Sequence, residues 1–166
     1  MKPGLQKIYD ANIRDFSHLS PAQLMAITLW AEARGEPRDG KISVASVILE
    51  RVNHRGWDGK SIHEVCLWPR QFSCFNPDDI QRPKLVKFAK DIDFSISNDK
   101  ILKECYDISN GILTGNIQRD FDIMRTHCCQ YLNAVTAAKT RAKWIAAGIK
   151  SLKIVGRHEF FAEPKR

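Results

Sequence analysis

Glu32 is the residue of this chain whose setting most suggests chemistry. It lies in the run WAEARGEP, residues 30–37, where a glycine and a proline end an otherwise apolar helix. Between residues 24 and 33 the only polar residues are Thr28 and Glu32, so we expect a helix buried on most sides. Burial and the negative end of the helix dipole both raise the pKa of a carboxyl there, which suits a general acid. Taken alone, this residue would favour an ordinary helix-end Glu that turns outward or pairs with Arg34, and the wider sequence pattern is what reverses that interpretation.

The elements that position Glu32 can be predicted from local signals. Ser20, Pro21 and Gln23 form a capping-box start, which predicts a helix over residues 20–34. Helical spacing and stop signals predict further helices at about 39–52, 61–68, 83–90, 99–113 and 136–147. Residues 70–76 are predicted to be extended or a short strand, and residues 149–161 to supply one or two terminal strands. The fold class we expect is α+β, mainly helical, with a small β region.

Composition indicates a compact domain and leaves the partner open. The chain has 166 residues, 43% hydrophobic and 27% charged, without repeats or linkers, which fits one domain. Its net charge of +7 suits nucleic acid, anionic membranes or acidic polymers, and does not choose among them. Residues 1–19 lack the apolar core of a secretory signal, and no stretch approaches a membrane span. We therefore expect a cytoplasmic protein, with its five cysteines as reduced thiols.

Two early motifs carry a family resemblance. Residues 29–76 contain EARGE at 32–36 and QFS at 71–73, and they resemble the opening of the bacterial and phage cell-wall hydrolase family that includes the spore-cortex-lytic (SleB-like) enzymes. The resemblance continues through residues 126–133 and the GRHEFF run at 156–161; Glu50 stands where the family has Asn. It implies a lysozyme-like single domain over residues 19–166, preceded by an N-terminal extension over residues 1–18.

The resemblance also implies a reaction. It points to peptidoglycan glycan strands as substrate, cleaved between N-acetylmuramic acid and N-acetylglucosamine. A chain with one outstanding carboxyl, Glu32, fits a lytic transglycosylase, in which the substrate's own primary hydroxyl is the nucleophile. A lysozyme-like hydrolase (muramidase) is the alternative and needs a second carboxylate. The candidates for that group are Glu36, Asp39 and Asp58, with Glu36 the nearest in sequence to Glu32.

Substrate-binding residues are expected where amides, hydroxyls and rings gather in the matched motifs. Such groups can hydrogen-bond sugar hydroxyls and acetamido groups. The candidates are Gln71, Ser73, Asn76, His127 and Tyr131. For Phe72 we expect a core position and for His158 a structural role.

Other classes of function have weaker support. His127 precedes two adjacent cysteines, but the paired spacings of zinc sites are missing, so we expect no metal and no cofactor. The basic cluster at 139–143 would suit nucleic acid, yet no reading motif accompanies it. A non-catalytic glycan-binding module would make Glu32 dispensable. We expect instead a monomeric enzyme of the phage endolysin type that stays in the cytoplasm until it is released to the wall, without stable membrane insertion.

Overall fold

The computed structural model describes residues 1–53, 60–120, 126–130 and 134–162. Its elements are α1 (Pro3–Phe16), α2 (Pro21–Ala33), α3 (Arg38–Asn53), α4 (Ile62–Leu67), the short 3-10 helix η1 (Ser73–Phe75), α5 (Arg82–Lys90), α6 (Ile92–Asn98), α7 (Lys100–Thr114), β1 (Thr126–Gln130), α8 (Ala134–Ala146), β2 (Lys150–Val155) and β3 (His158–Ala162). The mainly helical α+β class is thus confirmed. No helix within these ranges has both the length and the apolar character needed to cross a membrane.

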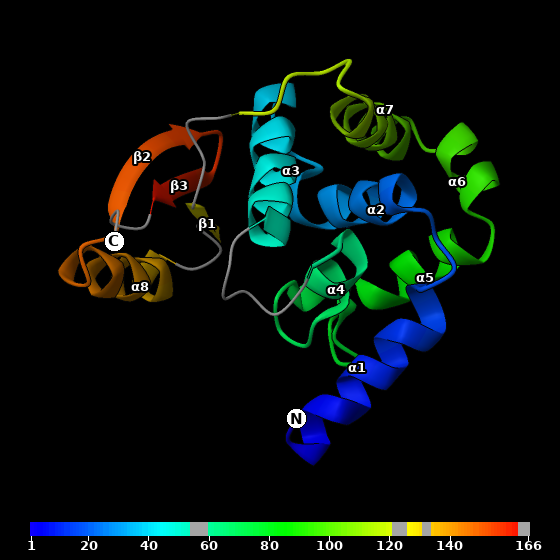
Figure 1. Ribbon diagram of the computed structural model, residues 1–166, viewed down its shortest axis with the longest axis horizontal. Coiled ribbons are helices and arrows are strands. Elements are labelled where there is room, and N and C mark those ends of the chain that lie inside the picture. Colours follow the sequence, from blue (N-terminus) through cyan, green and yellow to red (C-terminus); the bar gives the residue numbers. More distant parts are fainter. Residues whose placement is uncertain (54–59, 121–125, 131–133, 163–166) are drawn as a thin grey trace.

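Helix α2 is the centre of the helical body. It contacts α3, α4, α5, η1 and α7, and Figure 1 shows it enclosed by these elements. Its buried residues are Leu24, Met25, Ala26, Ile27, Thr28, Leu29, Ala31 and Ala33. Because these residues cover nearly the whole circumference of the helix, α2 is apolar on all sides rather than amphipathic. The burial predicted from the sequence is confirmed.

The capping box predicted at the start of α2 is present. The Ser20 hydroxyl accepts a hydrogen bond from the Gln23 amide at 3.2 Å, and the Gln23 side chain accepts one from the Ser20 amide at 2.9 Å. Two amides that the helix leaves without partners are satisfied in this way. The next helix, α3, begins at Arg38, one residue before the predicted start, and Asp39 lies in its first turn.

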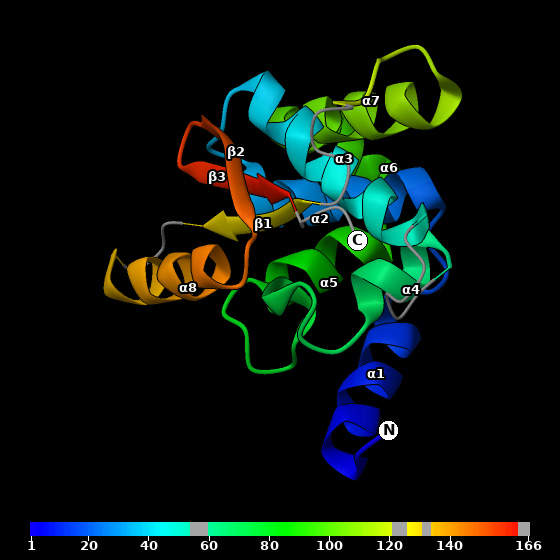
Figure 2. The same cartoon turned by 60° about the vertical axis from the view of Figure 1, so that its left-hand side comes forward.

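A small sheet lies beside α3. Its strand order is β1-β3-β2, and both pairings are antiparallel. β1 contacts α3, and α8 contacts β1 and β2, so the sheet lies between these two helices (Figure 2). The terminal strands were predicted, whereas β1 was not. The central strand β3 buries His158, Glu159, Phe160 and Phe161, and the Phe160 side chain belongs to the hydrophobic core.

The segment 70–76 differs from its prediction as an extended segment or short strand. Residues 73–75 form η1, in which the Asn76 amide donates to the Ser73 carbonyl at 2.8 Å. Before it, Arg70 has a positive φ of 66°, and its amide donates to the Asn76 side chain at 3.3 Å. These local bonds close the segment into a compact turn, which cannot pair as a strand.

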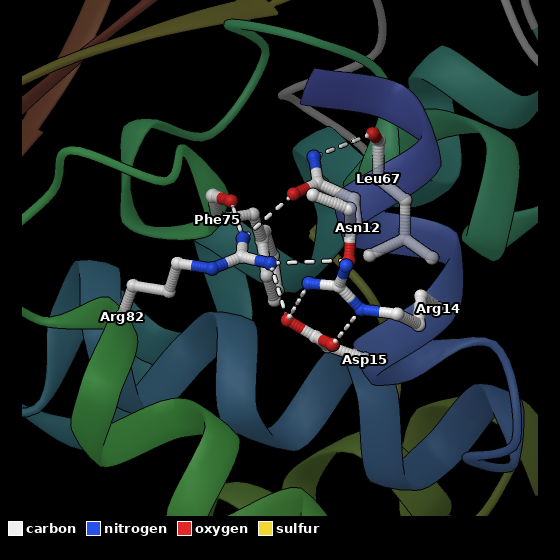
Figure 3. A network of polar contacts seen from close by, with 7 residues as sticks. Asn12, Arg14, Asp15, Leu67, Phe75 and Arg82 are labelled. Carbon is white, nitrogen blue, oxygen red and sulfur yellow. Dashed lines mark hydrogen bonds and ion pairs between the residues drawn. The ribbon is translucent and has the colours of Figure 1, made fainter. Parts of the chain in front are cut away.

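Helix α1 projects from the body but is anchored along its C-terminal half. The Arg82 guanidinium donates to the Asn12 side chain at 2.7 Å, to Asp15 at 2.7 Å and to the backbone carbonyl of Phe75 (Figure 3). Asn12 in turn donates to the Leu67 carbonyl at 3.0 Å. One buried arginine therefore joins α1 to α5 and to the end of η1.

Candidate active site

Glu32 lies in the last turn of α2, with its carboxyl group in a protein environment that favours the protonated form. Burial raises its pKa from 4.5 to about 7; a hydrogen bond from the Cys74 thiol and the charge of Arg51 oppose this rise, and the charge of Asp79 adds to it. The residue is half-buried, and its accessible part lines the pockets described below. A carboxyl with this pKa can donate and accept a proton near neutral pH.

The short helix η1 brings two neighbours to Glu32. Cys74 is fully buried and hydrogen-bonds the Glu32 carboxyl, and its own pKa is raised well above 9 by burial and by the Glu32 charge. Ser73 is exposed and lines the same pockets as Glu32. Phe72 is buried, as predicted, under the Arg51 guanidinium at 5.2 Å from the ring centre. The turn that replaced the expected strand therefore builds one wall around the acid.

Two pockets share Glu32 and Ser73. The larger pocket has a volume of about 460 Å³ and the smaller one about 220 Å³. The remaining lining of the larger pocket is Ala31, Arg34, Gly35, Glu36, Asp79, Ile80, Gln81, Arg157 and His158. That of the smaller pocket is Val44, Val47, Arg51, Arg70, Gln71 and Phe72. Because both pockets include Glu32, its carboxyl group faces open space from two differently lined pockets.

The predicted binding residues fall into three groups. Gln71 and Ser73 line the pockets, and the Gln71 side chain also accepts a hydrogen bond from Arg51 at 3.4 Å. Asn76 is absent from the described lining of both pockets and holds the Arg70 amide instead. His127 lies in β1 opposite Phe161, but its side chain lies outside the described part of the chain. Tyr131 lies outside the described residues altogether.

Glu36 lines the larger pocket, but both of its carboxylate oxygens already accept hydrogen bonds from Arg157. Its Oε2 accepts a hydrogen bond from the Arg157 amide at 2.8 Å, and its Oε1 accepts one from Arg157 Nε at 3.1 Å. Burial raises the pKa of this carboxyl, but the bonds from Arg157 and the nearby charges of His158 and Arg157 outweigh it, so the pKa lies below its usual value. Glu36 is thus an ionised group that holds the turn between β2 and β3.

Sequence reasoning missed several residues of the site. Asp79 lines the larger pocket with Glu32 and was not among the candidate second carboxylates. Of those candidates, Asp39 lines a different pocket and Asp58 lies outside the described residues. Arg157 and His158 were in a matched motif, which was the signal that could have found them. Within the described ranges, no three His, Cys, Asp or Glu side chains gather as metal ligands.

Comparison with known proteins identifies the family of the chain. Residues 35–161 match the family model described as Cell Wall Hydrolase, so the chain belongs to the cell wall hydrolase family. The match begins at Gly35, just after Glu32. The chain is also similar to a spore cortex-lytic enzyme of Oceanobacillus iheyensis, with 43% identity over 51 residues. That alignment covers 31% of this chain and 18% of the relative, so the chain spans a small part of that relative's length. No solved structure matches the chain.

Proposed function

We propose that this protein degrades peptidoglycan, cleaving the bond between N-acetylmuramic acid and N-acetylglucosamine as a lytic transglycosylase. Family membership supports the substrate class. The observation that carries the proposal is the position of Glu32, a carboxyl with a pKa of about 7 between two pockets. Glycan on either side of the scissile bond would occupy these two pockets.

The reaction uses Glu32 twice. Its carboxyl group first donates a proton to the glycosidic oxygen, and the bond from the anomeric carbon of the muramic residue to that oxygen breaks. The positive charge that develops on the sugar ring is stabilised by the acetamido group of the substrate and by fixed protein dipoles. The Glu32 carboxylate then takes the proton of the primary hydroxyl of the same muramic residue, and that oxygen bonds to the anomeric carbon. The products are an anhydro-muramic end and a free glucosamine end.

The arrangement of Glu36 favours a single-acid scheme. A nucleophile or general base must reach the substrate or a water molecule, whereas both oxygens of Glu36 accept hydrogen bonds from Arg157. The charge of an ionised carboxylate held in this way is largely compensated locally. It is better suited to fixing a turn than to attacking a sugar.

Hydrolysis is the second candidate, and one observation favours it. Asp79 lines the larger pocket beside Glu32 and is half-buried, with one oxygen accepting a hydrogen bond from the Gln81 amide at 2.8 Å. A retaining or inverting hydrolase needs a second carboxylate of this kind across the scissile bond. Under this alternative, Asp79 takes the role that the sequence assigned to Glu36.

Mass spectrometry of products from purified peptidoglycan tests both candidates. The wild type is compared with Glu32→Gln and Asp79→Asn, each checked for folding by circular dichroism. Anhydro-muramic ends from the wild type and from Asp79→Asn, but not from Glu32→Gln, would support the transglycosylase. Reducing muramic ends that disappear with Asp79→Asn would establish hydrolysis. Normal cleavage by folded Glu32→Gln would overturn the role of Glu32 in either scheme.

A further inference from the structure

His158 is a buried histidine in the larger pocket without a hydrogen-bond partner. It begins β3, is 1% exposed and lines the pocket together with Glu32. Neither ring nitrogen has a hydrogen-bond partner among the residues that the structure describes. Buried polar side chains nearly always have at least one partner, so an imidazole left unsatisfied at a pocket wall indicates a group that is completed by a ligand.

The nearest polar group does not satisfy the ring. His158 Nδ1 lies 3.9 Å from Glu36 Oε1, which is too long for a hydrogen bond. The ring also lies beside Phe160, with 6.1 Å between the ring centres. Burial lowers the pKa of His158, the charge of Glu36 raises it and that of Arg157 lowers it, with a net decrease. A neutral imidazole offers one donor and one acceptor.

The backbone that carries His158 is held in place by the turn that precedes it. Gly156 has a φ of 58°, and a Cβ atom built on it would lie 1.7 Å from Glu36 Oε2. The following residue, Arg157, gives its backbone amide to the same oxygen. The Glu36 carboxylate therefore packs directly against this turn. The contact fixes the start of β3 relative to the end of α2. A backbone fixed before the ligand arrives does not have to be ordered at the time of binding.

We propose that His158 contacts the glycan. Its imidazole donates a hydrogen bond to, and accepts one from, hydroxyl or acetamido groups of the sugar residue in the larger pocket. Glu36 and Arg157 are positioning residues, which act by holding the turn that carries this ring. The inference rests on the proposed function and adds a substrate contact to it. It also assigns a role to a residue for which the sequence suggested only a structural one.

Kinetics with a matched histidine control give the first test. His63 is half-buried, and its ring already bonds the Leu19 carbonyl at 2.8 Å, away from both pockets. We expect His158→Ala to lower kcat/KM for a soluble peptidoglycan fragment about tenfold, mainly through KM, as expected for the loss of one or two hydrogen bonds. His63→Ala should leave kcat/KM unchanged. Equal effects of the two substitutions, or no effect of His158→Ala, would overturn the proposal.

Nuclear magnetic resonance of the imidazole nitrogens tests the contact with His158 intact. Glu32→Gln, which binds without turnover, is titrated with a tetrasaccharide of alternating glucosamine and muramic residues. We expect the ring nitrogen signals of His158 to shift at saturation and those of His63 to stay. If the tetrasaccharide binds and the His158 signals do not move, His158 does not contact the glycan, while the proposed function stands. If it does not bind and the wild type cleaves no peptidoglycan, the proposed function fails, and the contact with it.

Discussion

The Cys74 thiol donates a hydrogen bond to the Glu32 carboxyl, joining η1 to the end of α2 at the proposed acid. The bond stabilises the ionised carboxyl, whereas burial favours the neutral form. Burial is the larger effect, and the pKa of Glu32 lies at about 7. The acid is therefore balanced between its two protonation states near neutral pH, as a group that gives and then takes a proton must be.

The pH dependence of activity should report this balance. Because the proposed reaction begins with protonated Glu32, kcat/KM should be constant in mildly acidic solution and fall above a pH of about 7. At higher pH the decrease should approach about tenfold per unit, since the protonated fraction falls at that rate. Rates measured with a soluble peptidoglycan fragment from pH 5 to 9 check this. A decrease centred near 4.5 would contradict a raised pKa.

The same ionisation should affect stability. The pKa of Glu32 is higher in the folded protein, about 7 against 4.5, so the unfolded chain ionises first as pH rises. The contribution of protonated Glu32 to folding stability is fully present below pH 4.5 and is lost as the pH rises through about 7. Glu32→Gln removes the buried charge, so we expect it to exceed the wild type in unfolding free energy by about 1 to 3 kcal/mol at pH 8. At pH 4 the two should be nearly equal in urea titrations.

The hydrogen bond from Cys74 to Glu32 can be tested through the pH dependence of activity. Cys74→Ala removes a donor that stabilises ionised Glu32, so the pKa of Glu32 should rise and the high-pH decrease in activity should move upward. Cys74→Ser keeps a donor and should leave the decrease near its wild-type position. Cys105→Ala is the control, because this free cysteine is buried in α7 and absent from the described lining of both pockets. A shift with Cys105→Ala as large as with Cys74→Ala would contradict the assigned bond.

The turn before His158 can be tested at its glycine. Gly156→Ala places a Cβ atom against Glu36 Oε2 at a positive φ, so both strain and displacement of the carboxylate are expected. We predict a loss of about 2 to 4 kcal/mol in stability, together with lower activity. Gly115→Ala is the matched control, because Gly115 has a φ of 80° with nothing within 4 Å of its Cβ position. It should lose only about 1 kcal/mol and keep its activity; equal losses would argue against contact with Glu36.

The anchoring of α1 depends on one of two arginines that pair with Asp15. The Arg82 side chain is 8% exposed and the Arg14 side chain 73% exposed. Arg82→Met leaves buried acceptors on Asn12 and Phe75 without their donor, and we expect a loss of about 3 to 5 kcal/mol in urea unfolding. Arg14→Met should change stability little, since its ion pair is in solvent. Similar losses for both would contradict the network in Figure 3.

Local signals predicted those parts of the fold that local interactions determine. The limits of α2 followed from its capping box and its glycine and proline, and the burial of Glu32 followed from its apolar neighbours. The helix α1 was missed because its buried face carries Asn12, whose partners come from distant segments. β1 lacks apolar alternation and is defined by its pairing with β3.

The candidate site also combines residues that local sequence motifs indicate with residues that only tertiary packing brings in. Glu32, Gln71 and Ser73 are in contiguous motifs, and the structure places them at the same pockets, while their catalytic and binding roles stay predictions. Asp79 reaches the larger pocket through tertiary packing, and no motif near it in the sequence indicated its position. His158 lies in the matched GRHEFF motif, but its place beside Glu32 depends on the packing of β3, which the motif alone does not give. The roles of His127 and Tyr131, the domain boundary at residue 19, the lysozyme-like fold, the monomeric state and the phage endolysin setting with its cytoplasmic stage stay predictions.

The bond between Glu36 and Arg157 also bears on the order in which the parts of the candidate site assemble during synthesis. The two residues are 121 positions apart, so their contact closes a very long loop and cannot form until β3 has left the ribosome. By then the segments that make up the helical body, with the acid in place, have already been synthesised. A nascent chain that stops before residue 155 therefore carries Glu32 but lacks the part of the larger pocket that Arg157 and His158 provide. The larger pocket is therefore complete only after β3 has been synthesised and has paired with the other strands.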